Sequence, residues 1–458
     1  MKVIVCGAGQ VGSNIARQLA QENNDITLID QSAELVRKFG DELDVRTMVG
    51  HASYPDALER AGAYDADMII AVTYSDEVNM VACQIAHSIF DIPKKIARIR
   101  AQQYTNPLWA HLFSRENLPI DVIISPEIEV ARAIERRLKV PGAFDTVPFG
   151  DGKVQVIGVR LDENCPIVNT PLKQLTELFP DLNVVVVAIY RDGKMIVPAS
   201  GDQMFPGDEV YFAADTDHVA RAMPLFGHEE QEARSIVLVG GGNIGLNLAQ
   251  FIEKNMRNVS LKLIEHNRAR AEKITEELDR TVVLHGSALD PELLQEANAA
   301  RAETIVALTN DDQVNILSSL LAKGQGTKTA VTLINNPVFG NLVTSLGIEV
   351  VVDPRATTVS EILRHIRRGR IRGLHSFRDG AAEVVEGDAL ETSLLVGKPL
   401  RDIKLPPGTI IGAVIKSNKV EIPRGETVIQ EDDRVIILGL RDSIHKVEEM
   451  FSVGLEFF

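Results

Sequence analysis

The chain carries the stretch Val3-Ile4-Val5-Cys6-Gly7-Ala8-Gly9-Gln10-Val11-Gly12, an apolar run followed by the glycine pattern G-x-G-x-x-G. Such a turn allows a tight exit from a strand, close approach of a pyrophosphate to the backbone, and close packing of the next helix on the sheet. The N-terminus of that helix offers N–H groups and partial positive charge to phosphates. The stretch therefore predicts a dinucleotide-binding turn, for which a glycine-rich packing turn is the alternative.

An acidic residue completes the pattern about 20 residues later. Asp30 ends the strand-like segment Ile26-Thr27-Leu28-Ile29. A carboxylate at this place accepts hydrogen bonds from ribose hydroxyls and repels a 2′-phosphate. We therefore expect the site to prefer NAD(H) or an adenine nucleotide to NADP(H).

The same arrangement occurs again in the middle of the chain. The run Ile236-Val237-Leu238-Val239 precedes Gly240-Gly241-Gly242-Asn243-Ile244-Gly245, and Glu265 ends the next strand-like segment. The triple glycine leaves open whether this copy binds in a different way or not at all. Two copies indicate a protein that senses a nucleotide rather than one that consumes it.

The duplication extends beyond the glycines. Gly50-His51-Ala52 matches Gly286-Ser287-Ala288, and the segment Thr73–Asn79 matches Thr309–Asn315. Each half alternates strand-like and helix-like segments, which is typical of a parallel sheet wrapped by helices. His51 follows the third strand, where a contact to adenosine and a solvent-facing role are equally compatible with the sequence.

A further helix and a smaller lobe follow each sheet. The helices start at Pro126 and Pro354 and are expected to reach about Leu138 and Arg368. Short strand-like segments with hairpin signals such as Asp192-Gly193 come next. The predicted fold class is α/β, a tandem repeat of a Rossmann-like parallel-sheet N-lobe plus a small α+β C-lobe.

The expected boundaries follow this plan. They are 1–124 for the first N-lobe, 125–141 for its crossover helix, 142–227 for the first C-lobe, 233–352 for the second N-lobe, 353–372 for its crossover helix and 373–458 for the second C-lobe. The acidic stretch 228–232 is expected to be a hinge between the halves.

Composition limits the classes of partner. The 458 residues suit roughly three or four domains, and the net charge of −16 argues against general binding to nucleic acid or anionic lipid. No apolar run approaches the roughly 20 residues that span a bilayer, and we expect no signal peptide ahead of the first strand. The three cysteines lack C-x-x-C spacing, which fits a reducing cytoplasm.

The complete pattern resembles the regulator of potassium conductance family, over essentially the whole chain. In that family a crossover helix joins a Rossmann-like N-lobe to a small C-lobe. The resemblance implies a cytoplasmic homo-oligomer, a tetrameric ring, that binds NAD(H) or ATP and ADP in its clefts. It also implies peripheral docking, through a membrane potassium-translocating subunit, on the cytoplasmic face of the inner membrane, with control of the opening of that partner. It implies no catalytic residue, no metal and no nucleic acid.

The resemblance also assigns residues to the clefts. Thr73 and Tyr74 are expected near the phosphates or the nicotinamide, with Thr309 and Asn310 as their equivalents. Arg98 is expected to be a basic contact, and Thr332 stands at its expected place in the second half, so the second site would lose a cation. The expected cofactor-binding residues are Gly7, Ala8, Gly9, Gln10, Val11, Gly12, Asp30, His51, Thr73, Tyr74, Arg98, Gly240, Gly241, Gly242, Asn243, Ile244, Gly245, Glu265, Thr309 and Asn310.

Other interpretations carry less weight. Tyr190 and Lys194 have the spacing of a dehydrogenase pair, but Asp192-Gly193 predicts a hairpin that separates them. An NAD-dependent oxidoreductase would need a substrate domain, and a redox-sensing transcription regulator would need a basic reading element. The run Arg364, Arg367, Arg368, Arg370 and Arg372 is either a solvated helix end or a subunit or phosphate contact. The working nucleotide is left open.

Overall fold

A computed structural model describes residues 1–21, 24–179, 183–230, 232–348, 350–366, 371–378 and 380–451. The chain forms two compact units. The first comprises residues 1–130 and 354–366, and the second comprises residues 131–353 and 367–458. The division differs from the duplication in the sequence, because the second crossover helix belongs to the first unit.

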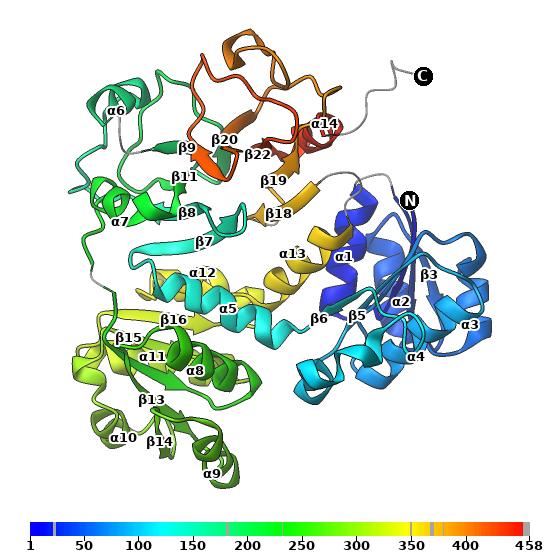
Figure 1. Ribbon diagram of the computed structural model, residues 1–458. Coiled ribbons are helices and arrows are strands. Elements are labelled where there is room, and N and C mark those ends of the chain that lie inside the picture. Colours follow the sequence, from blue (N-terminus) through cyan, green and yellow to red (C-terminus); the bar gives the residue numbers. More distant parts are fainter. Residues whose placement is uncertain are drawn as a thin grey trace. The chain divides into compact units, whose positions relative to one another are not determined.

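The first unit contains a six-stranded parallel sheet (Figure 1). Its strand order is β3-β2-β1-β4-β5-β6, so the order reverses between β1 and β4. The strands are β1 (Lys2–Cys6), β2 (Asp25–Asp30), β3 (Arg46–Val49), β4 (Met68–Ala71), β5 (Lys94–Arg98) and β6 (Val122–Ile124). The helices of this lobe are α1 (Gln10–Gln21), α2 (Ala33–Glu42), α3 (Pro55–Arg60) and α4 (Asp76–Ser88). Every residue of β4 is buried, as expected for a central parallel strand with helices on both faces.

The crossover helix of the second half completes this unit. Helix α13 (Pro354–Ile366) packs against α1 and β6, and Figure 1 shows it beside α1. The Lys94 ammonium donates a hydrogen bond to the carbonyl oxygen of His365 on this helix. Ile362 and Leu363 are fully buried. The apolar face of α13 is thus part of the core of the first unit.

The second unit repeats the sheet. Its order is β14-β13-β12-β15-β16-β17, again entirely parallel. The strands are β12 (Ser235–Val239), β13 (Ser260–Glu265), β14 (Val282–His285), β15 (Thr304–Ala307), β16 (Thr329–Leu333) and β17 (Val350–Val352). The helices are α8 (Asn243–Asn255), α9 (Arg268–Glu277), α10 (Pro291–Glu296), α11 (Asp312–Gln325) and α12 (Gly340–Ser345).

The first crossover helix, α5 (Pro126–Leu138), contacts this second N-lobe along the part that belongs to the second unit. Asn255 on α8 donates from Nδ2 to Oε1 of Glu135 at 2.8 Å. The guanidinium carbon of Arg132 lies 5.9 Å from the centre of the Phe251 ring. Each crossover helix therefore packs on the N-lobe of the other half.

The two C-lobes share one core inside the second unit. The first sheet has the antiparallel order β10-β9-β11-β8-β7, and the second has β18-β19-β22-β20-β21. The strands are β7 (Ala143–Phe149), β8 (Val154–Arg160), β9 (Val184–Arg191), β10 (Lys194–Ile196), β11 (Glu209–Asp215), β18 (Ile371–Phe377), β19 (Ala382–Asp388), β20 (Thr409–Lys416), β21 (Lys419–Glu421) and β22 (Arg434–Leu440). The helices are α6 (Leu172–Leu178), α7 (Val219–Ala222) and α14 (Ile444–Glu449). Val187, Tyr211, Phe377 and Ile436 belong to a single apolar cluster formed by both lobes.

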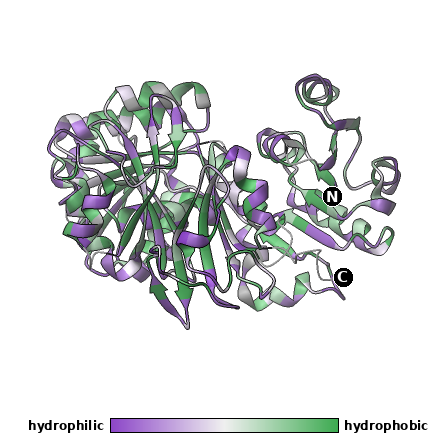
Figure 2. Cartoon of the chain, turned by 90° about the horizontal axis from the view of Figure 1, so that it is seen from above, coloured by the Kyte–Doolittle hydropathy of each residue, from purple (hydrophilic) through white to green (hydrophobic). Residues whose placement is uncertain are grey.

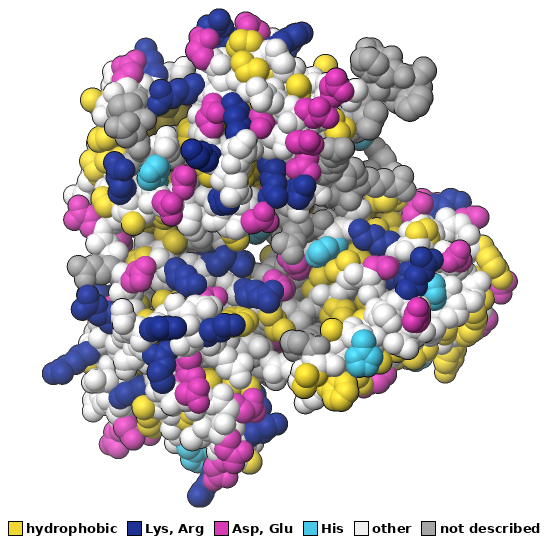
Figure 3. All heavy atoms as spheres, in the orientation of Figure 1, with side chains coloured by type: hydrophobic (Ala, Val, Ile, Leu, Met, Phe, Trp, Pro, Cys, Tyr) yellow, Lys and Arg dark blue, Asp and Glu magenta, His cyan; other side chains and the backbone are white. Residues whose placement is uncertain are grey.

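Hydrophobic and hydrophilic residues are distributed differently between the sheets and the segments outside them. In Figure 2 the strands are mainly hydrophobic in colour, and the helices and loops outside them carry most of the hydrophilic colour. Figure 3 shows acidic and basic side chains interspersed on the visible face. Among the described residues, no helix combines the length and apolar character needed to cross a bilayer. Cys6, Cys83 and Cys165 are buried free thiols, and burial raises the pKa of Cys6 to about 12.

The predicted fold class is confirmed, and three strands were missed. Strand β7 contains Pro148 and lies at a sheet edge, which weakens its sequence signal. Strand β18 is an edge strand of the second C-lobe sheet. Strand β19 is buried although it contains Glu383, Glu386 and Asp388, and such acids disguise a central strand. The hairpin at Asp192-Gly193 is confirmed, because it places Tyr190 and Lys194 on different strands.

The expected hinge and the basic run both include residues that lie outside the described ranges. Gln231, within the expected hinge 228–232, is outside them, whereas the ring nitrogen Nε2 of His228 lies 3.0 Å from the carbonyl oxygen of Arg160. Arg367, Arg368 and Arg370 of the basic run are also outside them. Arg372 pairs through Nε with both carboxylate oxygens of Asp388 at 2.7 Å.

Candidate nucleotide-binding site

Each glycine turn has a backbone that a side chain would not tolerate. Gly7 and Gly240 have φ angles of +106° and +100°, in the left-handed region that favours glycine. A Cβ atom on Gly12 would lie 1.8 Å from the carbonyl oxygen of Gly7. The equivalent Cβ on Gly245 would lie 2.0 Å from the carbonyl oxygen of Gly240. The third glycine of each turn thus permits the close contact between α1 or α8 and the end of the first strand.

The middle glycine of each turn faces open space instead. A Cβ atom on Gly9 or Gly242 would meet no atom of the described residues within 4 Å. Gln10 and Asn243 begin helices α1 and α8 directly after these glycines, and both residues are exposed. An anion can therefore approach the backbone at the start of either helix.

The acidic residues are fixed to the turns by backbone hydrogen bonds. Asp30 accepts from the N–H of Ala8 at 2.6 Å and from the N–H of Ser32 at 2.8 Å, one on each oxygen. Glu265 accepts in the same way from Gly241 and from Asn267, both at 2.7 Å. A carboxylate has about four acceptor positions. Each acid can therefore brace the turn and still accept hydrogen bonds from ribose hydroxyls.

A buried asparagine organises the end of the fourth strand. In the first half, Asn79 is fully buried, and its Oδ1 accepts from the N–H of Thr73 at 2.8 Å and from the Thr73 hydroxyl at 2.7 Å. In the second half, Asn315 is also fully buried and holds the same groups of Thr309 at the same two distances. Thr73 and Thr309 are thus fixed at the carboxyl edge of their sheets, where ligands of this fold bind.

A buried aspartate fixes the segment after the fifth strand. Asp76 accepts from the backbone N–H of Arg100 and of Ala101, at 2.8–3.0 Å. Asp312 accepts from Asn335 and Asn336 in the same manner. Asp76 and Asp312, like Asn79 and Asn315, were not among the residues predicted for the site. Their recurrence at equal spacing in both halves was the available signal.

Arg98 places a cation beside this framework. Its Nη2 donates to the carbonyl oxygen of Thr73 at 2.8 Å, and its Nε is enclosed with no hydrogen bond to any residue in the described ranges. Burial lowers the pKa of Arg98 and the neighbouring Arg100 lowers it further, whereas Glu127 and Asp76 act in the opposite direction. The guanidinium remains charged at neutral pH.

The expected equivalent of Arg98 was wrong. The carbonyl oxygen of Arg98 accepts from Nδ2 of Asn79 at 2.9 Å, and the carbonyl oxygen of Leu333 accepts from Nδ2 of Asn315 at 2.9 Å. Leu333, not Thr332, therefore corresponds to Arg98, as the strand registers also require. Equal spacing from Asn315 would give Ile334, and because the connection after Asn315 is one residue shorter than the one after Asn79, the equivalent position is Leu333. The second half still has an apolar residue where the first has a cation.

The second half carries a cation elsewhere in its cleft, at a position that was not predicted. Arg270 on α9 donates from Nε to the carbonyl oxygen of Gly241 at 2.8 Å. Its Nη2 is enclosed and has no hydrogen-bond partner within the part of the chain that the structure describes. The cation near the second glycine turn, Arg270, thus lies after β13, the second strand of its sheet. In the first half the cation, Arg98, lies at the end of β5, the fifth strand.

The other expected residues lie at the periphery. Tyr74 is 85% exposed, with the guanidinium carbon of Arg100 lying 5.3 Å from its ring centre. Asn310 is also exposed. His51 stacks on Tyr54 with 4.5 Å between ring centres, and its Nδ1 lies 2.8 Å from the hydroxyl of Ser53. The structure therefore brings Thr73 and Arg98 together. Tyr74 lies instead against Arg100, and His51 stacks on Tyr54.

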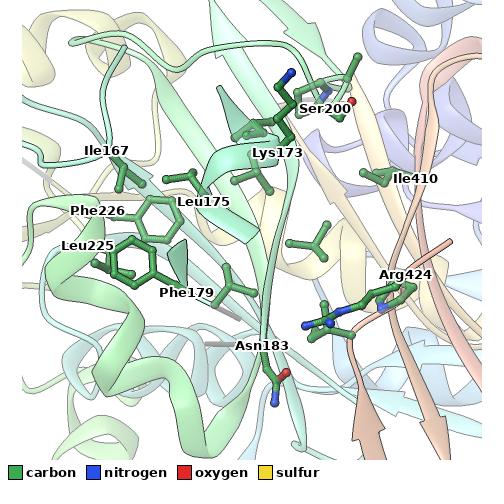
Figure 4. A pocket seen from close by; sticks show the side chains of 18 residues that line it. Ile167, Lys173, Leu175, Phe179, Asn183, Ser200, Leu225, Phe226, Ile410 and Arg424 are labelled. Atoms are coloured by element: carbon green, nitrogen blue, oxygen red, sulfur yellow. The ribbon is translucent and has the colours of Figure 1, made fainter. Parts of the chain in front are cut away.

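A cavity of about 260 Å³ lies in the C-lobes (Figure 4). Its lining is mainly apolar and includes Leu175, Val186 and Phe226 from the first C-lobe and Ile410 from the second. None of its lining residues belongs to a glycine turn, and neither Asp30 nor Glu265 lines it. The cavity is thus separate from both glycine turns.

Family comparisons match both lobes of each half. The TrkA-N domain matches residues 3–126 and 236–354, and the TrkA-C domain matches residues 156–227 and 385–452. A Trk system potassium uptake protein TrkA from Azorhizobium caulinodans is 54% identical over 458 residues, covering 100% of both chains. The protein of that name from Halomonas elongata is 44% identical over 462 residues, again covering 100% of both.

Solved structures share the fold. The GsuK RCK domain superimposes with a TM-score of 0.61 at 17% identity, covering 98% of this chain and 94% of that chain. The GsuK channel bound to NAD has a TM-score of 0.61 at 17% identity, covering 98% of this chain and 78% of that chain. At this identity the likeness concerns the fold alone.

Proposed function

Because the chain belongs to the TrkA family of potassium uptake proteins, we propose that it is a regulatory subunit of a Trk-type potassium uptake system. Its proposed ligand is NAD(H), with ADP or ATP competing for the same clefts. Its proposed partner is the membrane potassium-translocating subunit, met at the cytoplasmic face of the inner membrane. The proposed assembly is a tetrameric ring.

One observation carries the proposal. In both halves a carboxylate accepts the backbone N–H of the glycine turn, at 2.6 Å for Asp30 and 2.7 Å for Glu265. In both halves the middle glycine, Gly9 or Gly242, faces space free of described atoms. A ribose acceptor beside an open phosphate position is what an adenosine-containing dinucleotide requires.

The crossover helices provide a route from ligand to assembly. Helix α1 begins at the first glycine turn and packs against α13, and the chain after α13 continues into the second C-lobe. Helix α8 begins at the second turn and contacts α5 through Asn255 and Glu135, and α5 leads into the first C-lobe. A ligand that prefers one arrangement of these helices would shift the equilibrium by its difference in affinity, with coupling of roughly 1–3 kcal/mol.

We favour regulation over catalysis because the chain repeats its nucleotide module where an oxidoreductase would place a substrate domain. Catalysis of hydride transfer would need positioned acid and base groups beside the nicotinamide. Turnover of NADH with added electron acceptors would contradict this part of the proposal.

Calorimetric titration tests the ligand. We expect NADH and ADP to bind the full-length protein, with Asp30→Ala and Glu265→Ala each weakening one class of site by about tenfold or more, because a charged acceptor is lost. Asp44→Ala, which removes an exposed acid on the first N-lobe, is the matched control for Asp30→Ala. Unchanged binding in both cleft variants would exclude the ribose assignment.

Co-purification tests the partner. We expect the protein to be retained by detergent-solubilised membranes that contain a Trk-type potassium-translocating subunit, and NADH or ADP to change potassium flux in the reconstituted complex. Retention without any nucleotide effect on flux would refute gating while leaving the subunit role intact. Loss of the complex in mild detergent would count against the partner itself.

A further inference from the structure

The two clefts exchange a cation for a leucine at two equivalent places. At the end of the fifth strand, Arg98 in the first half corresponds to Leu333 in the second. At the start of the helix after the second strand, Leu35 corresponds to Arg270. Leu35 and Arg270 are equivalent because each donates its backbone N–H to the side chain of the N-cap residue of its helix. Leu35 donates to Ser32 at 3.3 Å, and Arg270 donates to Asn267 at 3.0 Å. Each cleft therefore has, at one of these two places, an arginine that the other cleft lacks.

These positions lie on opposite sides of the central strand. The strand order of the first N-lobe, β3-β2-β1-β4-β5-β6, puts the end of β2 on one side of β1 and the end of β5 on the other. The second N-lobe has the same order, so Arg270 follows β13 on the side of the ribose-binding acid. In this fold a dinucleotide spans the central crevice, with its adenosine ribose at the acid. Arg270 thus belongs to the adenosine half, and Arg98 to the other half.

The two arginines are also bonded alike. Each gives one N–H to a backbone carbonyl of its cleft, Arg98 to Thr73 and Arg270 to Gly241, both at 2.8 Å. Each keeps one enclosed nitrogen, Nε of Arg98 and Nη2 of Arg270, with no partner among the residues that the structure describes. An enclosed donor without an acceptor is unfavourable, so an acceptor brought by a ligand is favoured there.

We propose that the two clefts recognise opposite halves of the dinucleotide. The first cleft holds the half beyond the adenosine through Arg98 and therefore binds the complete NAD(H) more tightly than ADP. The second holds the adenosine half through Arg270, whose charge offsets that of Glu265, and therefore accepts an adenosine phosphate such as ADP nearly as well as NADH. This inference rests on the proposed nucleotide-binding function and assigns a different ligand class to each cleft.

The test compares ADP with NADH in proteins that keep one working cleft. Glu265→Ala leaves the first cleft and Asp30→Ala leaves the second, both in the full-length chain. We expect the ratio of the ADP to the NADH dissociation constant to be at least tenfold larger in the first cleft. Equal ratios in the two clefts would overturn the inference, while binding itself would leave the proposed function standing. Absence of any nucleotide binding by the wild-type protein would instead refute the proposed function.

Exchange of the two positions identifies the residues responsible. In the second-cleft protein, Arg270→Leu should weaken ADP binding about tenfold, and Arg270→Lys should retain part of the affinity because the charge remains. In the first-cleft protein, Leu35→Arg should strengthen ADP binding severalfold, a gain that misfolding cannot imitate. An ADP affinity that changes less than twofold in both Arg270→Leu and Leu35→Arg would overturn the assignment. Thermal unfolding of each variant checks that the lobes remain folded.

Discussion

The first and second N-lobes hold their glycine turns with the same backbone contacts, yet they carry different side chains around them. The tight φ angles, the carboxylate on the turn and the buried asparagine recur with nearly equal distances. The cations do not recur. Leu333 occupies the position equivalent to Arg98, and Leu35 occupies the position equivalent to Arg270. The backbone framework is thus fixed by packing, whereas the charges on it can be redistributed without changing the fold.

The largest effect is expected from the third glycine of each turn. Gly12→Ala and Gly245→Ala would place a methyl group about 2 Å from a backbone carbonyl oxygen, which cannot move aside as a side chain can. We expect each substitution to destabilise its N-lobe by about 3–5 kcal/mol. Thermal unfolding followed by circular dichroism measures this. A stable Gly245→Ala beside an unstable Gly12→Ala would break the equivalence of the two turns.

A smaller effect is expected in the C-lobes, where the halves are not equivalent. Burial would raise the pKa of Asp145 on β7, but the nearby imidazole of His375 on β18 and the charge of Arg137 on α5 lower it overall. We expect Asp145→Asn to cost about 3 kcal/mol at neutral pH, since it leaves Arg137 without its carboxylate.

The pH dependence of that cost follows from the lowered pKa. The unfolded chain takes up the proton first as the pH falls, so the contribution of Asp145 is complete above about pH 4 and declines below it. Urea unfolding of wild type and Asp145→Asn between pH 7 and pH 3.5 should therefore show a converging difference. A difference that grows on acidification would contradict the ion-pair assignment.

The buried asparagines allow a matched test of the site framework. Asn79→Ala and Asn315→Ala each leave the backbone N–H of a threonine without its acceptor. The threonine hydroxyl keeps a second acceptor, the carbonyl oxygen of Ser75 or of Asp311. We expect a cost of about 2 kcal/mol in either lobe. Hydrogen exchange at the threonine N–H reports it locally. Protection that survives in one variant alone would show that the two strand ends are held differently.

The smallest effect on stability, and the clearest on binding, is expected from the middle glycines. Gly9→Ala and Gly242→Ala add a methyl group that meets no described atom within 4 Å. We expect unchanged melting temperatures and about tenfold weaker nucleotide binding, because the methyl group occupies the approach of the phosphate. Calorimetry beside thermal unfolding separates the two readouts. A loss of stability with intact binding would reverse our interpretation of this space.

The sequence predicted the N-lobes better than the C-lobes, for a physical reason. Parallel strands such as β4 are buried on both faces and read as continuous apolar runs. Strand β19 is equally buried but contains Glu386 and Asp388, whose charges are balanced by Arg434 from the neighbouring strand β22. Pairing of this kind depends on residues far apart in the chain, so local pattern could not reveal it.

The candidate site likewise has residues that the sequence predicted and residues that it did not. Glycines and acids were predicted because their spacing along the chain reflects the local geometry of one turn. The position of Arg270 was missed because its contact with Gly241 joins residues 29 positions apart. Leu333 was missed as the equivalent of Arg98 because counting along the chain does not give the strand register, in which Thr332 pairs with Ala307 as Ala97 pairs with Ala71.

The exchange of crossover helices has a consequence for how this chain can be divided. A fragment ending before residue 228 would contain the first N-lobe without α13, and would leave the faces of α1 and β6 that α13 covers open to water. Cutting the chain between its two halves would therefore separate α13 from the N-lobe on which it packs.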